Sequence, residues 1–287
     1  MLSIIICSRN NSISDLLMNN INESVGIEHE LVIVGNYNNK YSIFSAYNEG
    51  VKRAKYPYLC FMHDDIFYHT QNWGEKVISH FRNDIVGLIG VIGTHYFFSG
   101  PFPWWQADIT SGIYIRNSID RNEIETIKYL DFMNNVSSIE VVAVDGFWFC
   151  INKRLFSLIS FDEQTFSGFH CYDTDICFQV REHNYQVRVV SDIIIEHFSD
   201  GNADLKWAEN CILLWKKWKK QLPQSAGVVI SENIKKNKEI ELMEYLSNMI
   251  LDYYRNKEAL SKLQKSWAYL LGKLLLRPLK IFKVLSY

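Results

Sequence analysis

Residues 58–69 of the chain read YLCFMHDDIFYH, an apolar run that stops at His63, Asp64 and Asp65 and then turns apolar again. The short apolar run predicts a buried strand over residues 57–62. Two adjacent carboxylates are costly unless a cation compensates them, so one interpretation is a divalent ion that holds a pyrophosphate. The other is a solvated turn in which Asp65 caps the next element. The stretch by itself leaves both interpretations open.

Strands and helices are expected to alternate around this stretch. Short β-branched runs at residues 3–7 and 31–34 enclose a polar, helix-compatible segment over residues 12–24. The next expected elements are helices at residues 42–55 and 73–82 and a strand at residues 85–92. Such alternation predicts an α/β sandwich with a largely parallel sheet. Ligands bind such sheets at the carboxyl ends of the strands, where residues 63–65 are expected to lie.

The pattern loosens over residues 94–140, where the aromatic stretch THYFFSGPFPWWQAD precedes a polar segment. We expect an irregular segment here that is functional or mobile. Order resumes after it with an apolar stretch, a loop, a helix at residues 173–183 and two strands. Beyond residue 203 the chain is rich in Leu, Lys and Glu. The expected organisation is therefore a domain over residues 1–202 and a helical C-terminal extension over residues 203–287.

Composition limits the classes of function. The 287 residues, 48% of them hydrophobic and 14% aromatic, can bury a sizeable core, and a formal net charge of -2 gives no global reason to expect nucleic acid. Six scattered cysteines without a CxxC pair suggest reduced thiols in a cytosolic protein. We expect neither a signal peptide nor a spanning helix, because no basic leader and no run of about 18 apolar residues is present.

Two further polar motifs follow later in the chain. In YDTDICFQVRE, Asp173 and Asp175 lie at an expected helix start, where unpaired backbone amides favour carboxylates. That accounts for both residues, although the preceding loop GFHCY could also bring Asp173 into a cleft as a base. His197 ends the run DIIIEH, and a single histidine is more often structural than a ligand. Two carboxylate sites and one imidazole together favour a combined metal and base site.

In order along residues 2–200, these motifs resemble the nucleotide-sugar-dependent glycosyltransferases of the GT-A fold, in particular family 2 and its bacterial branch with a His-Asp-Asp motif. SIIICSRN resembles the first strand and nucleotide-binding turn, and SAYNEGVKRAKYPYLCFMHDD the Asn-x-Gly helix and DxD-type motif. VDGFWFCINKRLF and the segment through YDTDICFQVREHNYQVRVV resemble the acceptor side, and IIIEHFS the late metal-binding histidine. The resemblance implies a Rossmann-like, three-layer α/β sandwich with a mostly parallel sheet.

The resemblance also implies roles for single residues. Asp65 is the principal ligand of a Mn²⁺ or Mg²⁺ ion, and His197 is a further ligand or a pyrophosphate contact. Asp64 contacts the ribose or the water shell of the ion, and Asp173 is the general base. The implied contacts of the nucleotide are Ser8, Arg9, Asn10, Asn36 and Asn48. Asp145, Gly146 and Tyr172 are implied to line the pocket for the acceptor or the donor sugar.

Trp104 and Trp105 are a candidate lid or acceptor platform, because aromatic faces suit sugars and lipids. Core packing is the alternative, and it suits Phe97 and Phe98 better. The sequence departs from the family pattern at three places. Gly35 and Asn36 stand where relatives commonly carry an acidic residue that reads the base, Tyr172 replaces the usual Glu, and His63 stands where many relatives have a further Asp.

We therefore expect an inverting, metal-dependent, hexosyl-type glycosyltransferase. Its donor is expected to be a nucleotide-diphospho-sugar, UDP-linked, and its acceptor the hydroxyl of a saccharide or lipid-linked saccharide, in the synthesis of bacterial surface polysaccharides or glycoconjugates. One alternative is a catalytically inactive nucleotide- or sugar-binding module on the same fold. Another is a metal-dependent phosphohydrolase that uses Asp64 and Asp65, which the Asn-x-Gly helix does not support.

Residues 262–287 carry six basic and no acidic side chains between large apolar residues. This pattern suits a helix in the membrane interface, which would place a cytoplasmic protein on the inner face of the cell membrane. The alternative is an amphipathic helix docked on the catalytic domain or on a second subunit in a homodimer. Both interpretations remain open.

Overall fold

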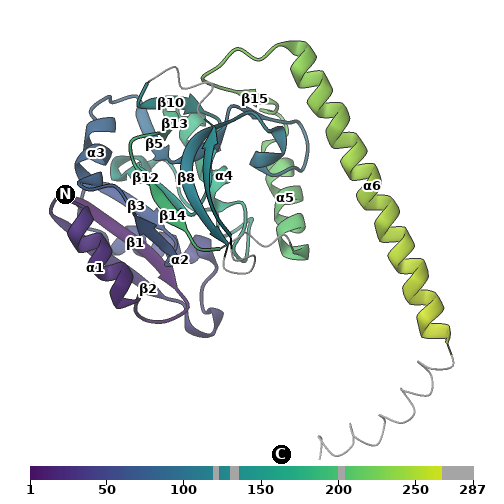
Figure 1. The fold of residues 1–287 in the computed structure, drawn as a ribbon, viewed down its shortest axis with the longest axis horizontal. Helices are drawn as coiled ribbons and strands as arrows, with labels where there is room; N and C mark the ends of the chain where they lie inside the picture. Colours follow the sequence, from purple (N-terminus) through teal and green to yellow (C-terminus); the bar gives the residue numbers. More distant parts are fainter. Residues whose placement is uncertain (119–122, 130–135, 200–203, 267–287) are drawn as a thin grey trace, which may run out of the picture. The chain divides into compact units, whose positions relative to one another are not determined.

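The computed structural model describes residues 1–118, 123–129, 136–199 and 204–266 (Figure 1). It divides the chain into two compact units, Met1–Ile230 and Ser231–Tyr287. The first unit contains every strand of the described residues, arranged in three sheets, and the second contains a long helix.

A seven-stranded sheet forms the core of the first unit. Its strands, in spatial order, are β10 (Ser138–Val141), β13 (Gln186–Val190), β5 (Val86–Gly90), β12 (Trp148–Asn152), β3 (Tyr58–Met62), β1 (Leu2–Ser8) and β2 (His29–Gly35). β1 is parallel to both β2 and β3, and β13 is parallel to β5, whereas β12 and β10 are antiparallel to their neighbours. Five of the seven strands therefore run in one direction. The mostly parallel α/β fold expected from the sequence is confirmed.

The central strands of this sheet are buried on both faces. Residues 2–6 of β1 and 59–62 of β3 are fully covered, which explains their continuous apolar sequences. In parallel sheets, helices provide that cover, and α2 (Ile43–Arg53) packs on β1 and β2. A Cβ atom at Gly50 would lie 2.3 Å from Cγ2 of Ile5. The glycine of the Asn-x-Gly sequence thus allows α2 to approach β1.

Several helices begin at a side chain that caps their first turn. Side chains of Ser14, Ser42 and Asp204 accept hydrogen bonds from the first turns of α1, α2 and α5. The bounds of the remaining helices are α1 (Asp15–Ser24), α3 (Trp73–His80), α4 (Tyr172–Glu182), α5 (Leu205–Trp218) and α6 (Glu232–Lys265), with short 3-10 turns η1 (Tyr37–Asn39), η2 (Trp104–Ala107) and η3 (Lys153–Ser157).

A second, six-stranded sheet lies at the end of β3. Its members are β11 (Ala143–Val144), β6 (Ile92–Thr94), β8 (Thr110–Ser118), β14 (Ile195–His197) and β4 (Ile66–Tyr68), with β9 (Glu123–Tyr129) paired to β8. A third sheet pairs β7 (Tyr96–Phe97) with β15 (Gln224–Ser225).

Two expectations about strands were wrong. The single strand predicted at residues 85–92 is divided between β5 and β6, which belong to different sheets. The stretch 94–140, predicted to be irregular, contains the antiparallel pair β8 and β9. Five of the seven residues of β9 are Glu, Thr, Lys or Tyr, and six are exposed. A strand that pairs with a single neighbour and packs only Ile127 against the core lacks the apolar pattern from which strands are predicted.

α5 belongs to the first unit, although the sequence suggested a boundary at residue 203. The carboxylate of Asp175, on α4, is 1% exposed and lies 2.7 Å from Nε1 of Trp218 and 2.8 Å from Nζ of Lys217. These bonds join the end of α5 to α4.

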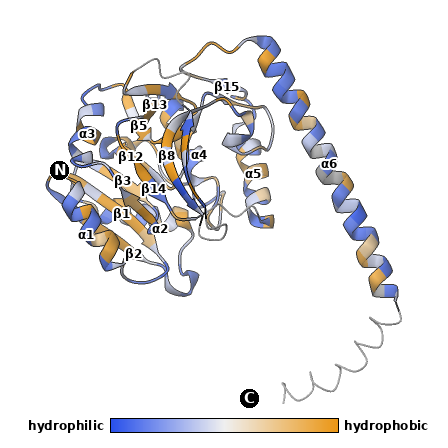
Figure 2. Cartoon of the chain, viewed as in Figure 1, coloured by the Kyte–Doolittle hydropathy of each residue, from blue (hydrophilic) through white to orange (hydrophobic). Residues whose placement is uncertain are grey.

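In the second unit, α6 mixes polar and apolar residues along its length (Figure 2). None of the described helices combines the length and the hydropathy needed to cross a membrane. Residues 267–287, which make up most of the predicted membrane-binding tail, lie outside the described residues. All six cysteines are free thiols.

Candidate functional site

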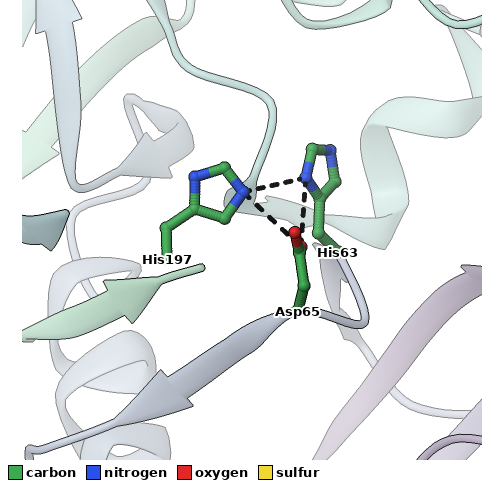
Figure 3. A group of neighbouring side chains, drawn as sticks. All are labelled: His63, Asp65 and His197. Atoms are coloured by element: carbon green, nitrogen blue, oxygen red, sulfur yellow. Dashed lines mark hydrogen bonds and ion pairs between the residues drawn. The ribbon is translucent and has the colours of Figure 1, made fainter. Parts of the chain in front are cut away.

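Two segments far apart in the sequence bring three metal-ligating side chains together. His63 and Asp65 lie in the turn between β3 and β4, and His197 is the last residue of β14. β14 pairs antiparallel with β4, with His197 opposite Ile66, and the backbone N–H of Phe198 donates to the carbonyl of Asp65 at 3.0 Å. This pairing sets His197 beside Asp65 (Figure 3).

The three ligand atoms face one another. Nε2 of His197 lies 3.5 Å and Nδ1 of His63 3.7 Å from the same oxygen of Asp65, and the two nitrogens are 3.3 Å apart. Two imidazoles and a carboxylate at such separations could hold one cation. The sequence pointed to Asp65 and His197 as ligands and gave His63 no ligand role, so His63 is an addition from the structure.

The tautomer of His63 follows from its other nitrogen. Nε2 of His63 is 2.8 Å from the hydroxyl of Tyr172, which itself donates to the carbonyl of Gly146 at 3.0 Å. Because the tyrosine proton is used there, Nε2 of His63 carries a proton and donates it to Tyr172. The lone pair of Nδ1 is then free to face Asp65 and His197.

The charge states of His63 and Asp65 also suit the binding of a cation. Burial, and then the neighbouring His197, lower the pKa of His63 to about 4 against the opposing effect of Asp65, so the imidazole is neutral at pH 7. Burial alone would raise the pKa of Asp65, but the hydrogen bond and charge of His197 outweigh it and hold this pKa below its usual range. The site therefore presents a carboxylate and a neutral imidazole. The ring of Phe147 stacks on that of His197, with centroids 4.7 Å apart.

Gly146 is part of the same arrangement. A Cβ atom at this position would lie 2.4 Å from the hydroxyl oxygen of Tyr172. Any larger residue would displace the tyrosine from the bond that orients His63. The predicted pocket residues Gly146 and Tyr172 are thus next to the cluster, and the structure gives them a positioning role.

Asp64 points to a different partner from Asp65. Its side chain is exposed and accepts a 2.6 Å hydrogen bond from the hydroxyl of Ser8, the last residue of β1. The backbone N–H of Asn10 lies 3.3 Å from the same hydroxyl, and Arg9 and Asn10 are exposed. The predicted nucleotide contacts Ser8, Arg9, Asn10 and Asp64 therefore lie together at the carboxyl ends of β1 and β3.

The side chains of Asn36 and Asn48, which were also predicted to contact the nucleotide, form hydrogen bonds to the backbone instead. The amide and carbonyl of Asn36 bond the backbone of Tyr41 at 2.9 and 2.8 Å and close the loop after β2. Those of Asn48 bond the backbone of Phe161 at 2.8 and 3.1 Å and join α2 to the segment before α4. Both side chains hold backbone in place, which is a structural role that the sequence did not suggest.

Asp173 is the second residue of α4 and follows Tyr172 directly. Burial, and then the charge of Asp145, raise the pKa of Asp173 to about 7, although the backbone N–H of Thr174 donates to its carboxylate at 2.8 Å. Burial also raises the pKa of Asp145, whose carboxylate accepts from the N–H of Phe147 at 3.0 Å. A carboxyl group with a pKa near neutrality, next in sequence to a residue that bonds the candidate metal cluster, is suited to proton transfer.

The two predicted tryptophans behave differently. Trp104 is 6% exposed and Nε1 of this residue has no hydrogen-bond partner within the described part of the chain. Core packing therefore describes Trp104, as it describes Phe97 and Phe98. Trp105 is 47% exposed and stacks on Trp207 of α5, with centroids 6.0 Å apart and an angle of 24° between the rings.

Two aromatic residues near the site were missed from the sequence. Trp207 is the partner of Trp105, and nothing in its helical context marked it. Phe169 is 47% exposed and its ring centroid lies 5.3 Å from that of His63. The glycine-bearing loop GFHCY was the available signal for Phe169.

Comparison with known proteins supplies the context for this geometry. The model of a glycosyltransferase-like family matches residues 3–219. The streptomycin biosynthesis protein StrF of Streptomyces griseus is 26% identical over 179 residues, which cover 60% of this chain and 59% of StrF. A crystal structure of GalNAc-T7 with UDP, GalNAc and Mn²⁺ is similar with a TM-score of 0.54 and 11% identity, over 77% of this chain and 49% of that chain. The structural likeness is one of fold, and the chain spans about half to three fifths of these two proteins.

Proposed function

The chain belongs to the glycosyltransferase-like family and has the GT-A fold, and from this we propose that it transfers a sugar from a nucleotide-diphospho-sugar to a hydroxyl acceptor with inversion. One observation carries the proposal. The His63, Asp65 and His197 cluster and Asp173, whose pKa is raised to about 7, are joined through the bond between Tyr172 and His63.

The ligand set fits a divalent cation, and it favours Mn²⁺ over Mg²⁺. Mg²⁺ prefers oxygen ligands and retains its waters, whereas two of the three atoms offered here are imidazole nitrogens. The GalNAc-T7 structure also contains Mn²⁺. When bound, such an ion would supply electrostatic stabilisation of the departing diphosphate.

The residues of the chain would provide the remaining steps. Asp173 would accept the proton of the attacking hydroxyl, an effect worth about 10² to 10⁴ in rate. One base and one displacement invert the anomeric centre. Asp145 would keep the pKa of Asp173 high and line the sugar pocket.

Donor binding is assigned to the ends of β1 and β3. Ser8, Arg9, Asn10 and Asp64 would contact the nucleotide, while Asn36 and Asn48 would support the loops around it. We propose a UDP-linked hexose as donor, because UDP accompanies the structurally similar GalNAc-T7.

The proposed acceptor is a saccharide or lipid-linked saccharide of bacterial surface glycoconjugates. Trp105 would contact it, because this residue is exposed where Trp104 is buried. The corresponding location is the cytoplasm, at the inner face of the cell membrane, and a homodimer is a further proposal.

The test is a thermal-shift panel of UDP, GDP, CMP and dTDP sugars, with and without Mn²⁺, followed by a donor-hydrolysis assay. We expect metal-dependent stabilisation by one nucleotide, and hydrolysis that Asp173→Asn abolishes without loss of nucleotide binding. Stabilisation without any turnover would favour an inactive binding module. Release of phosphate from simple esters without a sugar would favour a phosphohydrolase.

A further inference from the structure

Buried contacts fix which face of α5 is turned toward the core. Its inner face buries Cys211, Leu214 and Trp218, which are at most 4% exposed. Lys217 and Trp218 bond the buried carboxylate of Asp175 at 2.8 and 2.7 Å. The opposite face of the helix must therefore point outward.

That outward face has an unusual composition. It is made of Ile212, Trp215 and Lys216 on the helix, with Lys219 and Lys220 following its last residue, and we call these five residues the α5 basic face. At about 100° per residue, Ile212, Trp215, Lys216 and the C-cap residue Lys219 fall on one side of the helix. Ile212 is 43% exposed and the three lysines are exposed.

The lysines of the α5 basic face differ in ion pairing from the other lysines of the helix. Among the residues that the structure describes, no carboxylate forms an ion pair with them, whereas Lys206 pairs with Glu209 at 3.1 Å and Lys217 with two aspartates. The ammonium of Lys219 lies 5.9 Å from the ring centroid of Trp215. Cations are favoured near a helix C-terminus, which accounts for the lysines. It does not account for an exposed isoleucine and a half-buried tryptophan among them.

A surface that combines unpaired lysines with tryptophan and isoleucine matches one partner best. Tryptophan prefers the boundary between lipid headgroups and acyl chains, and lysines there extend to the phosphates. Nucleic acid would need a longer basic surface, and the chain as a whole carries a net charge of -2. We propose that the α5 basic face docks the protein on the surface of an anionic phospholipid bilayer. This docking involves neither residues 262–287 nor the proposed reaction.

The same helix contacts the loop that leads to α4 and to Asp173. The side-chain amide of Asn210 donates to the carbonyls of Ser167 and His170 at 2.8 and 3.1 Å, in the loop that leads to α4. Trp207, on the preceding turn, stacks on Trp105. If sugar transfer is the function, docking through α5 would bring the acceptor side of the site to the bilayer. This consequence rests on the proposed function, and it selects a lipid-linked acceptor.

The test is co-sedimentation of the full chain with vesicles. Vesicles contain either phosphatidylcholine alone or phosphatidylcholine and phosphatidylglycerol in equal parts. We expect binding to the anionic vesicles only, because each lysine near an anionic surface contributes about fivefold to partitioning. Lys216→Glu, Lys219→Glu and Lys220→Glu together should lower the partition coefficient by at least about 100-fold. Trp215→Ala should weaken binding without any change in charge.

The control carries Lys52→Glu, Lys128→Glu and Lys236→Glu, three exposed lysines on other elements, and so has the same net charge as the first triple variant. It should keep most of the binding, with unchanged circular dichroism in both variants. Three results would overturn the proposal: no binding of the wild-type chain to anionic vesicles, unchanged binding after substitution of the α5 basic face, or equal loss in the control. None of these readouts uses catalytic activity, so failure of the docking proposal is distinct from failure of the proposed function.

Discussion

The hydroxyl oxygen of Tyr172 lies 2.8 Å from Nε2 of His63, and this bond joins the first residue of α4 to the turn after β3. Asp173 is the next residue of α4. The candidate base and the candidate metal ligands are therefore held by one continuous set of contacts, although more than 100 residues separate Asp173 from His63 and Asp65 in the sequence.

Removal of this hydroxyl tests the orientation of His63. Tyr172→Phe leaves Nε2 of His63 without an acceptor, so the ring can change its tautomer or turn. Loss of such an outer contact typically lowers metal affinity about 10- to 100-fold, and we expect that change for Mn²⁺ by isothermal titration calorimetry. Tyr56→Phe is the matched control, because its hydroxyl bonds Glu28 beyond the opposite end of β3. Equal Mn²⁺ affinity in Tyr172→Phe and the wild type would show that the ion is bound elsewhere.

Asp173 should determine the pH dependence of transfer. A general base acts when ionised, and the pKa of this carboxyl is raised to about 7. The rate should therefore be low at pH 5, rise through about pH 7 and level off above pH 8. Asp173→Asn should lower kcat by about 10² to 10⁴ with little change in donor affinity. A rate that is independent of pH between 5 and 8 would argue against this residue as the base.

Asp145 should shift that profile without replacing the base. Its charge is the second cause of the raised pKa of Asp173, after burial. Asp145→Asn removes the charge and keeps an acceptor for the N–H of Phe147. The midpoint of the rate against pH should move to lower pH, because the ionised form of Asp173 is then less disfavoured. If the midpoint of the pH profile did not move, the charge of Asp145 would not be a cause of the raised pKa of Asp173.

The metal preference can be measured without a substrate. Two imidazole ligands should make stabilisation by Mn²⁺ larger than stabilisation by Mg²⁺ at equal concentration, as the shift of the melting temperature. Asp65→Asn should remove most of the Mn²⁺ effect. Asp64→Asn should leave it nearly intact, because Asp64 bonds Ser8 and lies outside the cluster. A larger loss of the Mn²⁺ effect in Asp64→Asn than in Asp65→Asn would contradict the ligand assignment.

Lys217 and Lys216 form a matched pair for stability. Lys217 neutralises Asp175, which is 1% exposed, and its loss leaves a buried charge without its cation. Lys217→Ala should lower the free energy of unfolding by about 3 kcal/mol, measured with urea. Lys216→Ala should change it by less than about 0.5 kcal/mol, as is usual for an exposed position. Similar effects of the two variants would mean that the ion pair does not anchor α5.

The sequence was sufficient for the elements that bury apolar surface. β1, β2 and β3 have continuous apolar runs, and α1, α2, α3 and α4 lie within about three residues of their predicted bounds. β9 was missed because it pairs with β8 and packs only Ile127 against the core, so its largely exposed, polar sequence carries little burial signal.

Within the site, the strand-end positions of Asp65 and His197 favoured a metal site, and the family resemblance implied their roles as ligands. His63 was not, because its role depends on the pairing of β4 with β14 and on the hydroxyl of Tyr172, which are contacts between distant segments. Asn36 and Asn48 were predicted as site residues and have another role in the structure. Their positions suggested donor binding, but hydrogen bonds to Tyr41 and Phe161 that no local pattern encodes occupy both side chains.

The bond between His63 and Tyr172 also limits how the two positions can diverge during evolution. A carboxylate at position 172 could not donate to the carbonyl of Gly146, and it would favour a charged imidazole at position 63, which is a poor ligand. A histidine before Asp64 and Asp65 and a tyrosine before Asp173 should therefore be inherited together. In an alignment of close homologues, we expect positions 63 and 172 to change as a pair.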